Sequence, residues 1–128
     1  MDKLSVSQED YLKEIYRMYT RGETIRITDI AQSLGISKPS VNKAVKLLMQ
    51  MGYISHEHYG DIQLTPSGME VGREITENFK VARKFLSEVL GVPEETARAE
   101  AHGMEHILSR GTRKKMKKYM KKLKKQAK

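Results

Sequence analysis

The chain has 128 residues, of which 38% are apolar and 31% are charged. That is enough for one ordinary domain, or two small ones, with a compact helical core. It contains no cysteine, which excludes disulfides, thiolate metal sites and a cysteine nucleophile.

The formal net charge of +8 is unevenly distributed along the chain. Residues 110–128 carry 11 Lys or Arg and no acid, whereas residues 1–109 carry 13 Lys or Arg against 16 Asp or Glu. The basic balance therefore belongs to the C-terminal tail and is no evidence that the rest of the chain binds nucleic acid. No signal-peptide run or stretch of transmembrane length occurs, so we expect a cytoplasmic protein with no membrane partner.

Residues 6–20 are predicted to form the first helix. Ser7 is its expected N-cap, and Arg21-Gly22 is its expected end. Apolar residues recur there with helical spacing: Tyr11, Leu12, Ile15, Tyr16 and Tyr19.

Residues 24–52 are typical of a helix-turn-helix. Thr28 is the expected cap of a short helix over residues 29–34, Gly35 follows it, and Ile36 should anchor the turn to the core. Ser37 should cap the second helix, with Pro39 in its first turn. The predicted buried stripe of this helix is Val41, Ala44, Val45, Leu47, Leu48 and Met51. A plain helical hairpin would not explain the phosphate-binding and base-binding groups at its exposed start.

Residues 53–65 alternate in polarity and contain the turn signal Tyr59-Gly60-Asp61, which predicts a two-stranded hairpin and makes the unit a winged helix. His56, His58 and Tyr59 lie on this wing. A solvated hairpin is favoured over a second metal site, and the wing tip remains a candidate for contact with the DNA backbone.

Three more helices are predicted, over residues 66–90, 93–109 and 113–126. The fold class is therefore mainly α, with an N-terminal winged helix-turn-helix followed by a helical domain. The segment 93–109 contains His102, Glu105 and His106. In a helix, this spacing puts the three side chains on one face within about one turn. Two imidazoles and a carboxylate are three of the four ligands that a small divalent metal site needs, although an exposed polar helix face is an equally simple interpretation.

Read together, these features resemble the diphtheria-toxin-repressor family of metal-dependent transcriptional regulators, which includes iron-dependent repressors and manganese transport regulators. The resemblance covers residues 5–109. The matching stretches are Gln8-Glu9-Asp10-Tyr11-Leu12-Lys13-Glu14-Ile15-Tyr16, Asp29-Ile30-Ala31 through Ser37-Lys38-Pro39-Ser40-Val41, Leu64-Thr65-Pro66-Ser67-Gly68, Phe85-Leu86 before Gly91-Val92, and Glu100-Ala101-His102-Gly103-Met104-Glu105-His106-Ile107-Leu108-Ser109.

The resemblance implies a winged helix-turn-helix DNA-binding domain over residues 1–72, a helical metal-binding and dimerisation domain over 73–109, and a Lys-rich helix over 110–128 in place of the SH3-like domain of many relatives. It implies these metal ligands: Asp10, His102, Glu105 and His106. His102 departs from the cysteine or carboxylate of relatives but still offers a ligand.

The family's second metal site falls here on Phe79, Arg83 and Arg98. Phenylalanine offers no ligand and arginine only donates, so that site should be absent. The paired-metal arrangement of the manganese regulators needs carboxylates at the positions of Lys13 and His102, so it should be absent too unless Glu14 joins the site. We predict one divalent metal per subunit. Mn(II) or Fe(II) is favoured for this mixed donor set, and Zn(II) and Co(II) stay open.

In the family, the metal joins the first helix to the dimerisation half. A homodimer with its heads about one DNA turn apart, ~34 Å, then fits a palindromic double-stranded DNA operator, and metal loss releases that fit. The predicted function is a metal-activated repressor of metal-uptake genes. The predicted DNA-binding residues are Ser37, Lys38, Pro39, Ser40, Asn42, Lys43 and Lys46, with Lys38 and Lys46 placed for phosphates and Pro39 for thymine methyl groups.

The Lys-rich C-terminal helix has three competing interpretations. Its apolar residues could pack on the partner subunit, its lysines could add a nonspecific DNA contact, or it could be a disordered or membrane-surface tail.

Two other functions compete with the metal sensor. His102-x-x-Glu105-His106 matches the H-x-x-E-H pattern of inverted zinc peptidases. However, no Asp or Glu follows Glu105 to act as a further ligand, so we predict no enzyme. The alternative is a winged-helix regulator that ignores metal and senses another ligand or partner.

Overall fold

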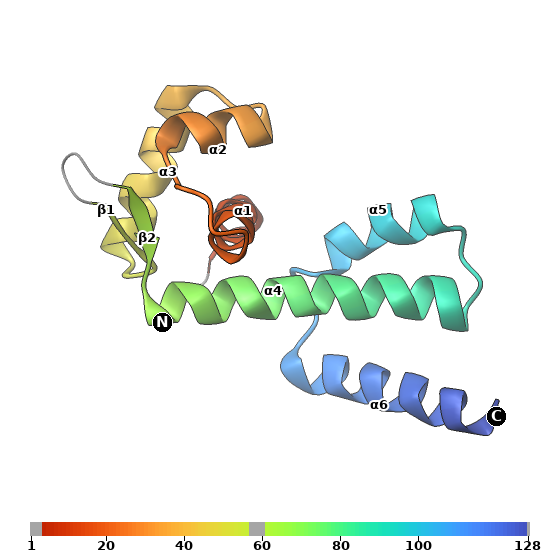
Figure 1. The fold of residues 1–128 in the computed structure, drawn as a ribbon. Helices are drawn as coiled ribbons and strands as arrows, with labels where there is room; N and C mark the ends of the chain where they lie inside the picture. Colours follow the sequence, from red (N-terminus) through yellow and green to blue (C-terminus); the bar gives the residue numbers. More distant parts are fainter. Residues whose placement is uncertain (1–3, 57–60, 128) are drawn as a thin grey trace. The chain divides into compact units, whose positions relative to one another are not determined.

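A computed structural model describes residues 4–56 and 61–127. The chain divides into two compact units whose boundary lies between Arg73 and Glu74, within helix α4 (Pro66–Lys84) (Figure 1). No helix in the described ranges is long and apolar enough to cross a membrane. Each unit has its own set of packed helices, as the mainly α pattern predicts.

The first unit is a winged helix-turn-helix. Its elements are α1 (Val6–Thr20), α2 (Ile27–Leu34), α3 (Lys38–Gln50), β1 (Ile54–His56), β2 (Ile62–Leu64) and the start of α4. The central core residues are fully buried aliphatic side chains from α1, α2, α3 and β2: Leu12, Ile15, Ile30, Val41, Leu48 and Ile62. This core fixes how the two helices of the helix-turn-helix cross.

Helix α1 has the predicted bounds but a different cap. Ser5, rather than Ser7, is the N-cap: its hydroxyl accepts a hydrogen bond from the Gln8 backbone, and the Gln8 side chain accepts one from the Ser5 backbone. This reciprocal pair of hydrogen bonds satisfies the backbone N–H groups of Ser5 and Gln8. Ser7 lies inside the first turn of the helix.

The helix-turn-helix also corrects three details of the prediction. Helix α2 begins at Ile27, so Thr28 lies inside it rather than capping it. Ile36 is 37% exposed and does not anchor the turn. The turn is closed instead by Gly35 in the left-handed conformation and by the Ile36 N–H, which donates to the Ala31 carbonyl. Leu47 is 40% exposed, because the buried stripe of α3 follows Val41, Ala44, Val45 and Leu48.

The hairpin pairs β1 with β2 in antiparallel register, with Ile54 opposite Leu64 and His56 opposite Ile62. The Ile62 N–H also donates to the Ile25 carbonyl, which fastens β2 to the segment before α2. His58 and the turn residues Tyr59 and Gly60 lie outside the described residues, whereas Asp61, the last residue of the predicted turn, lies 3.5 Å from the Arg26 guanidinium.

The second unit contains the rest of α4, the π-helical turn η1 (Phe85–Val89), α5 (Glu94–Met104) and α6 (Arg110–Gln126), with α4 between α5 and α6 (Figure 1). The predicted helix over 66–90 thus ends as a π-turn, in which the Leu90 N–H donates to the Phe85 carbonyl before Gly91 turns the chain. Helix α5 ends earlier than predicted, and α6 begins earlier because Ser109 caps it.

The first turn of α4 packs directly on the backbone near β1. A Cβ atom at Gly68 would lie 2.0 Å from the Tyr53 carbonyl oxygen. We therefore expect Gly68→Ala to lower the free energy of unfolding by about 1–3 kcal/mol or more, because the backbone must move to relieve the clash. Chemical denaturation followed by circular dichroism measures this change.

Gly111→Ala is the matched control for that substitution. Its nearest neighbour would be the Ser109 hydroxyl at 3.9 Å, so its stability should stay level or rise by up to about 1 kcal/mol. Equal stability of the two variants would contradict the close packing at Gly68.

Candidate functional site

In the second unit, the side chains of His102 and His106 converge on the carboxylate of Glu105. His102 lies in the last turn of α5, Glu105 is the residue that ends this helix, and His106 follows in a turn. The Nδ1 atom of His102 lies 3.3 Å from one carboxylate oxygen of Glu105, and the Nε2 atom of His106 lies 3.4 Å from the other. Each oxygen of this carboxylate therefore faces an imidazole nitrogen.

Each of these two separations, taken by itself, fits a pair of ligands on one divalent ion. Two donors that each lie about 2.1 Å from an ion at a tetrahedral angle are themselves about 3.4 Å apart. The Glu105 side chain is only 1% exposed and that of His106 only 8%. A charge this deeply buried needs strong compensation, which a bound cation would supply. The donor types, and the separation of Glu105 from His106, thus fit a divalent metal, while His102 faces the other oxygen of the carboxylate.

His102 differs from the other two candidates in its surroundings. Its side chain is 55% exposed, and its ring packs on the ring of Phe79 with centroids 4.5 Å apart. Phe79 occupies one of the positions where a second metal site would need a donor, and Arg83, another of them, forms an ion pair with Glu94 at 2.7 Å. These residues have other contacts here, and one metal per subunit stays a prediction.

The convergence does not come from one continuous helix face, as the sequence had suggested. Helix α5 stops at Met104, and the backbone at 105–108 turns through hydrogen bonds from Ile107 and Leu108 to the Met104 carbonyl. His102 and Glu105 keep the helical spacing of three residues, whereas His106 is brought in by the turn. The early end of α5 is therefore part of the site.

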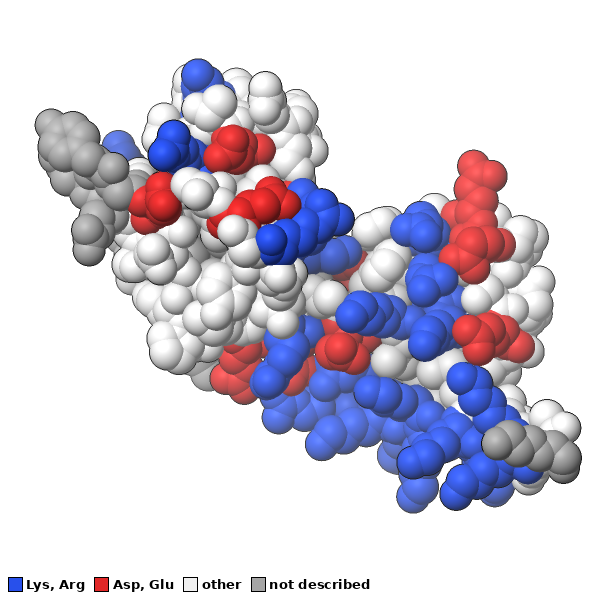
Figure 2. All heavy atoms as spheres, in the orientation of Figure 1, with Lys and Arg blue, Asp and Glu red and all other residues white. Residues whose placement is uncertain are grey.

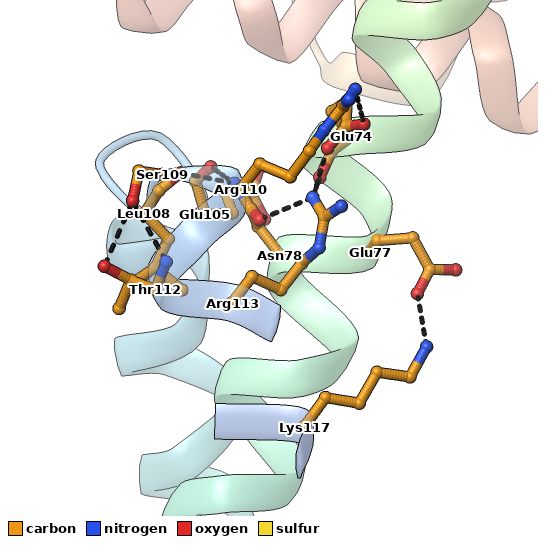
Figure 3. A network of polar contacts seen from close by, with 10 residues as sticks. All are labelled: Glu74, Glu77, Asn78, Glu105, Leu108, Ser109, Arg110, Thr112, Arg113 and Lys117. Atoms are coloured by element: carbon orange, nitrogen blue, oxygen red, sulfur yellow. Dashed lines mark hydrogen bonds and ion pairs between the residues drawn. The ribbon is translucent and has the colours of Figure 1, made fainter. Parts of the chain in front are cut away.

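Asn78 explains why the chain can turn there (Figure 3). Its side-chain amide, buried on α4, donates to the carbonyl oxygens of Glu105 and Leu108, both at 3.0 Å. Carbonyls at a helix end have no partner within the helix; Asn78 satisfies that of Glu105, which ends α5, and also that of Leu108 in the segment that follows. The side-chain oxygen (Oδ1) of Asn78 in turn accepts a hydrogen bond at 3.0 Å from Arg113 of α6, which also pairs with Glu74.

Sequence reasoning missed this network of Glu74, Asn78 and Arg113. One signal was present: Asn78 stands at a buried position in the apolar stripe of α4, between Ile75 and Ala82. A polar residue at such a position needs hydrogen-bond partners, but its partners lie 27 to 35 residues away in the chain. Spacing alone could not identify them.

The remaining candidate ligands lie on α1 of the first unit. Asp10 is exposed, and its role as a ligand stays a prediction. Glu14, which was left open as a ligand, binds Arg17 and accepts a hydrogen bond from the Ser33 hydroxyl at 2.6 Å. Burial would raise the pKa of Glu14, but the hydrogen bonds from Arg17 and Ser33 outweigh it and hold the pKa below its ordinary value. Glu14 thus ties α1 to α2.

The predicted DNA-binding residues all lie on the exposed side of α3 or at its cap. Ser37 caps the helix, and its hydroxyl bonds to the Ser40 backbone and side chain. Seven exposed side chains form this surface: Ser37, Lys38, Pro39, Ser40, Asn42, Lys43 and Lys46. The opposite face of α3 is buried in the core, so the helix can present this surface to a groove of DNA.

Two family descriptions match the chain along almost its whole length. Residues 3–62 match the N-terminal DNA binding domain of the iron dependent repressors. Residues 65–128 match their metal binding and dimerisation domain. The chain belongs to the iron dependent repressor family. It is a metal-dependent, DNA-binding transcriptional regulator that forms a homodimer, and the family is not one of enzymes.

Individual relatives agree with this assignment. An uncharacterized HTH-type transcriptional regulator of Methanocaldococcus jannaschii is 37% identical over 122 residues, covering 94% of this chain and 98% of the relative. The regulator MntR of Bacillus subtilis is 33% identical over 103 residues, covering 80% of this chain and 72% of MntR.

Solved structures share the fold. The manganese regulator SloR superposes with a TM-score of 0.77 at 26% identity, covering 89% of this chain and 53% of SloR. T. acidophilum IdeR gives a TM-score of 0.72 at 26% identity, covering 94% of this chain and 55% of IdeR. The chain spans about half the length of these two solved chains.

The carboxamide of Asn78 should be important for the stability of the second unit of this iron dependent repressor homologue. Asn78→Leu keeps the volume but leaves the Glu105 and Leu108 carbonyls and Arg113 without this partner. We expect a loss of about 2–4 kcal/mol in the free energy of unfolding, measured by urea denaturation of the metal-free protein. Arg83→Gln, which breaks a partly exposed ion pair on the same helix, should cost under about 1 kcal/mol. Equal losses would contradict the special role of Asn78.

Glu74 should make part of this stability depend on pH. The hydrogen bond from Arg113 holds the pKa of Glu74 below its ordinary value of 4.5. A pKa that is lower in the folded state stabilises the fold above about pH 4.5, and this contribution is lost as the pH falls through the folded value. The stability difference between wild type and Glu74→Gln should therefore shrink between about pH 5 and pH 3 in denaturation experiments. A difference that stays constant over this range would contradict the ion pair.

Proposed function

We propose that one divalent metal ion per subunit is held by Asp10, His102, Glu105 and His106, and that it joins the DNA-binding domain to the dimerisation domain. The carrying observation is the convergence of two imidazole nitrogens on the buried Glu105 carboxylate at 3.3 and 3.4 Å. Asp10 is the proposed fourth ligand because it is an exposed carboxylate on α1, at a position where the resembled family has a ligand.

When bound, the ion would supply a positive centre that neutralises the two carboxylates and cross-links the two domains. The residues of α1 would transmit this link. Tyr11 and Leu12, next to Asp10, are buried in the core of the DNA-binding unit, and Glu14 and Arg17 both bond to Ser33 of α2. A metal ion that fixes the position of Asp10 would therefore also fix the position of the whole helix-turn-helix.

On the DNA side, we propose that α3 enters the major groove of a palindromic operator, one α3 from each subunit about 34 Å apart. Lys38 and Lys46 would bind phosphates, while Pro39 and Asn42 would face base edges. The regulated genes would be those of metal uptake, repressed when metal is plentiful. Relatives support this direction, since one solved homologue is described as the manganese-activated repressor ScaR.

The donor set favours Mn(II) or Fe(II) as the cellular effector, because two carboxylates and two imidazoles without sulfur suit such ions. Relatives with manganese in their descriptions, such as SloR, support manganese. Another structure of ScaR holds Zn²⁺, and the affinity of such a site rises toward Zn(II), so Zn(II) and Co(II) belong in every titration.

Isothermal titration calorimetry with Mn(II), Fe(II), Co(II) and Zn(II) tests the ligand set. His106→Ala should abolish the site or weaken it by more than about 100-fold, since even the loss of an outer-shell partner costs about 10–100-fold. Asp10→Asn should weaken metal binding by at least about 10-fold. Asp29→Asn, on α2 of the same unit, is the matched control and should leave the affinity unchanged.

The outcomes separate the parts of the proposal. Full metal affinity in Asp10→Asn with none in His106→Ala would mean a site confined to the dimerisation domain, and the bridging mechanism would be wrong. Equal heats for wild type and His106→Ala would remove the metal site altogether. Duplexes selected from a random pool with wild-type protein and metal should lose binding when a chelator is added.

A further inference from the structure

The unit that reads DNA has no net formal charge, and its positive charge near DNA is limited to a few lysines of α3. Residues 1–73 contain nine Lys or Arg and nine Asp or Glu, so their formal charges cancel. Residues 74–109 carry four Lys or Arg against seven acids. Because neutralisation of phosphates supplies essentially all of a protein's nonspecific affinity for DNA, such a unit should bind duplex DNA weakly by itself. The excess positive charge of the protein lies elsewhere.

That charge is displayed on α6, where lysines cover the exposed surface (Figure 2). The helix has one half-buried side, formed by Arg113, Met116, Met120 and Leu123. The opposite side presents exposed lysines at intervals of three or four residues. This outer row consists of Lys114, Lys118, Lys122 and Lys125. At 1.5 Å per residue, the row extends over about 16 Å, a length along which a DNA duplex carries several phosphates.

The orientation of α6 is fixed by contacts within its own unit. Ser109 caps its start, and Arg113 pairs with Glu74 and Asn78 of α4. The ring of Tyr119 approaches that of Phe85, with centroids 6.4 Å apart. The half-buried side of α6 therefore makes contacts within its own unit, although no residue of this helix is fully buried.

A second row of lysines lines a groove between α4 and α6. The groove has a volume of about 320 Å³, with Val81 and Met120 as its apolar part. Five lysines lie along it: Lys80, Lys84, Lys117, Lys121 and Lys124. Two acids, Glu77 and Glu88, also line it, and Glu77 lies 3.9 Å from Lys117. The lining of the groove keeps a net positive charge. The groove and the outer row of lysines on α6 therefore both favour an anionic partner.

We propose that the lysine-covered face of α6 binds the phosphate backbone of duplex DNA and supplies most of the protein's sequence-independent affinity. DNA is the polyanion that a member of this family already binds through its other domain. A second copy of the chain fits this face poorly, because a two-fold interface would bring the same lysine rows together and like charges repel.

The salt dependence of binding to a duplex of arbitrary sequence tests this proposal. Each phosphate contact contributes about 0.9 to the slope of log affinity against log salt. We expect the triple variant Lys114→Gln, Lys118→Gln, Lys122→Gln to make the slope shallower by up to about 3 per bound subunit, and to weaken binding roughly tenfold per lost contact near 0.1 M salt. Glutamine keeps the helix propensity of lysine, which circular dichroism verifies.

The matched control removes the same three positive charges outside α6: Arg21→Gln, Arg73→Gln, Arg98→Gln. All three arginines are exposed, and none belongs to the proposed metal or DNA contacts. This control should keep the wild-type slope in a fluorescence anisotropy titration of a labelled duplex. Equal loss in both triple variants would mean that only net charge matters, and no loss in the α6 variant would remove the contact; either result overturns the proposal.

Two further experiments distinguish a failure at α6 from a failure of the metal site, and DNA binding from membrane binding. The His106→Ala protein should retain the nonspecific, salt-dependent binding even though it loses metal, so a failure of the metal site would not mimic a failure at α6. Binding of wild type to vesicles of phosphatidylserine and phosphatidylcholine is measured alongside. If vesicle binding falls in the α6 variant while the DNA slope stays unchanged, α6 is a membrane contact and the proposal is overturned.

Discussion

The carboxamide of Asn78 sets where α5 ends, and the arrangement of the candidate ligands follows from that point. By bonding to the carbonyls of Glu105 and Leu108, it makes a turn at 105–108 stable where a longer helix would have been the simpler local structure. The turn places His106 on the second oxygen of the Glu105 carboxylate. The same network reaches α6 through Arg113, so the ligand turn and the lysine-rich helix share one polar anchor.

Much of the fold could be predicted because its signals are local. The apolar spacing and terminal glycine of α1, the Gly35 turn with the Ser37 cap, and the alternating hairpin each lie within a few residues of one another. The errors came from competition between equally local signals. Ser5 displaced Ser7 because only Ser5 has Gln8 three residues ahead, which completes the reciprocal cap. Leu47 is apolar, but it lies at the flank of a stripe already filled by Ala44 and Leu48.

The candidate site was predictable only in part. The residue types at 102, 105 and 106 indicated a metal, but one helical face was the wrong geometry for them. Their arrangement depends on Asn78, and the placement of Asn78 depends on Arg113, across more than thirty residues of chain. No periodic pattern encodes such a pairing, because a buried asparagine states only that it needs partners and not which ones. The charge division was visible from the sequence, but only the packed side of α6 shows which lysines remain exposed.

A metal-dependent switch works best when the ion joins bodies that are already rigid, because every residue ordered on binding subtracts from the affinity. Both ends of the proposed link meet this condition. On one side, Leu12 and Ile15 seat α1 in the core, and Glu14 with Arg17 fastens it to Ser33 of α2. On the other, Asn78 and Arg113 hold the turn that carries Glu105 and His106. The binding free energy of the ion would then act mainly on the angle between the two units, which is the variable that a dimeric reader of paired half-sites must control.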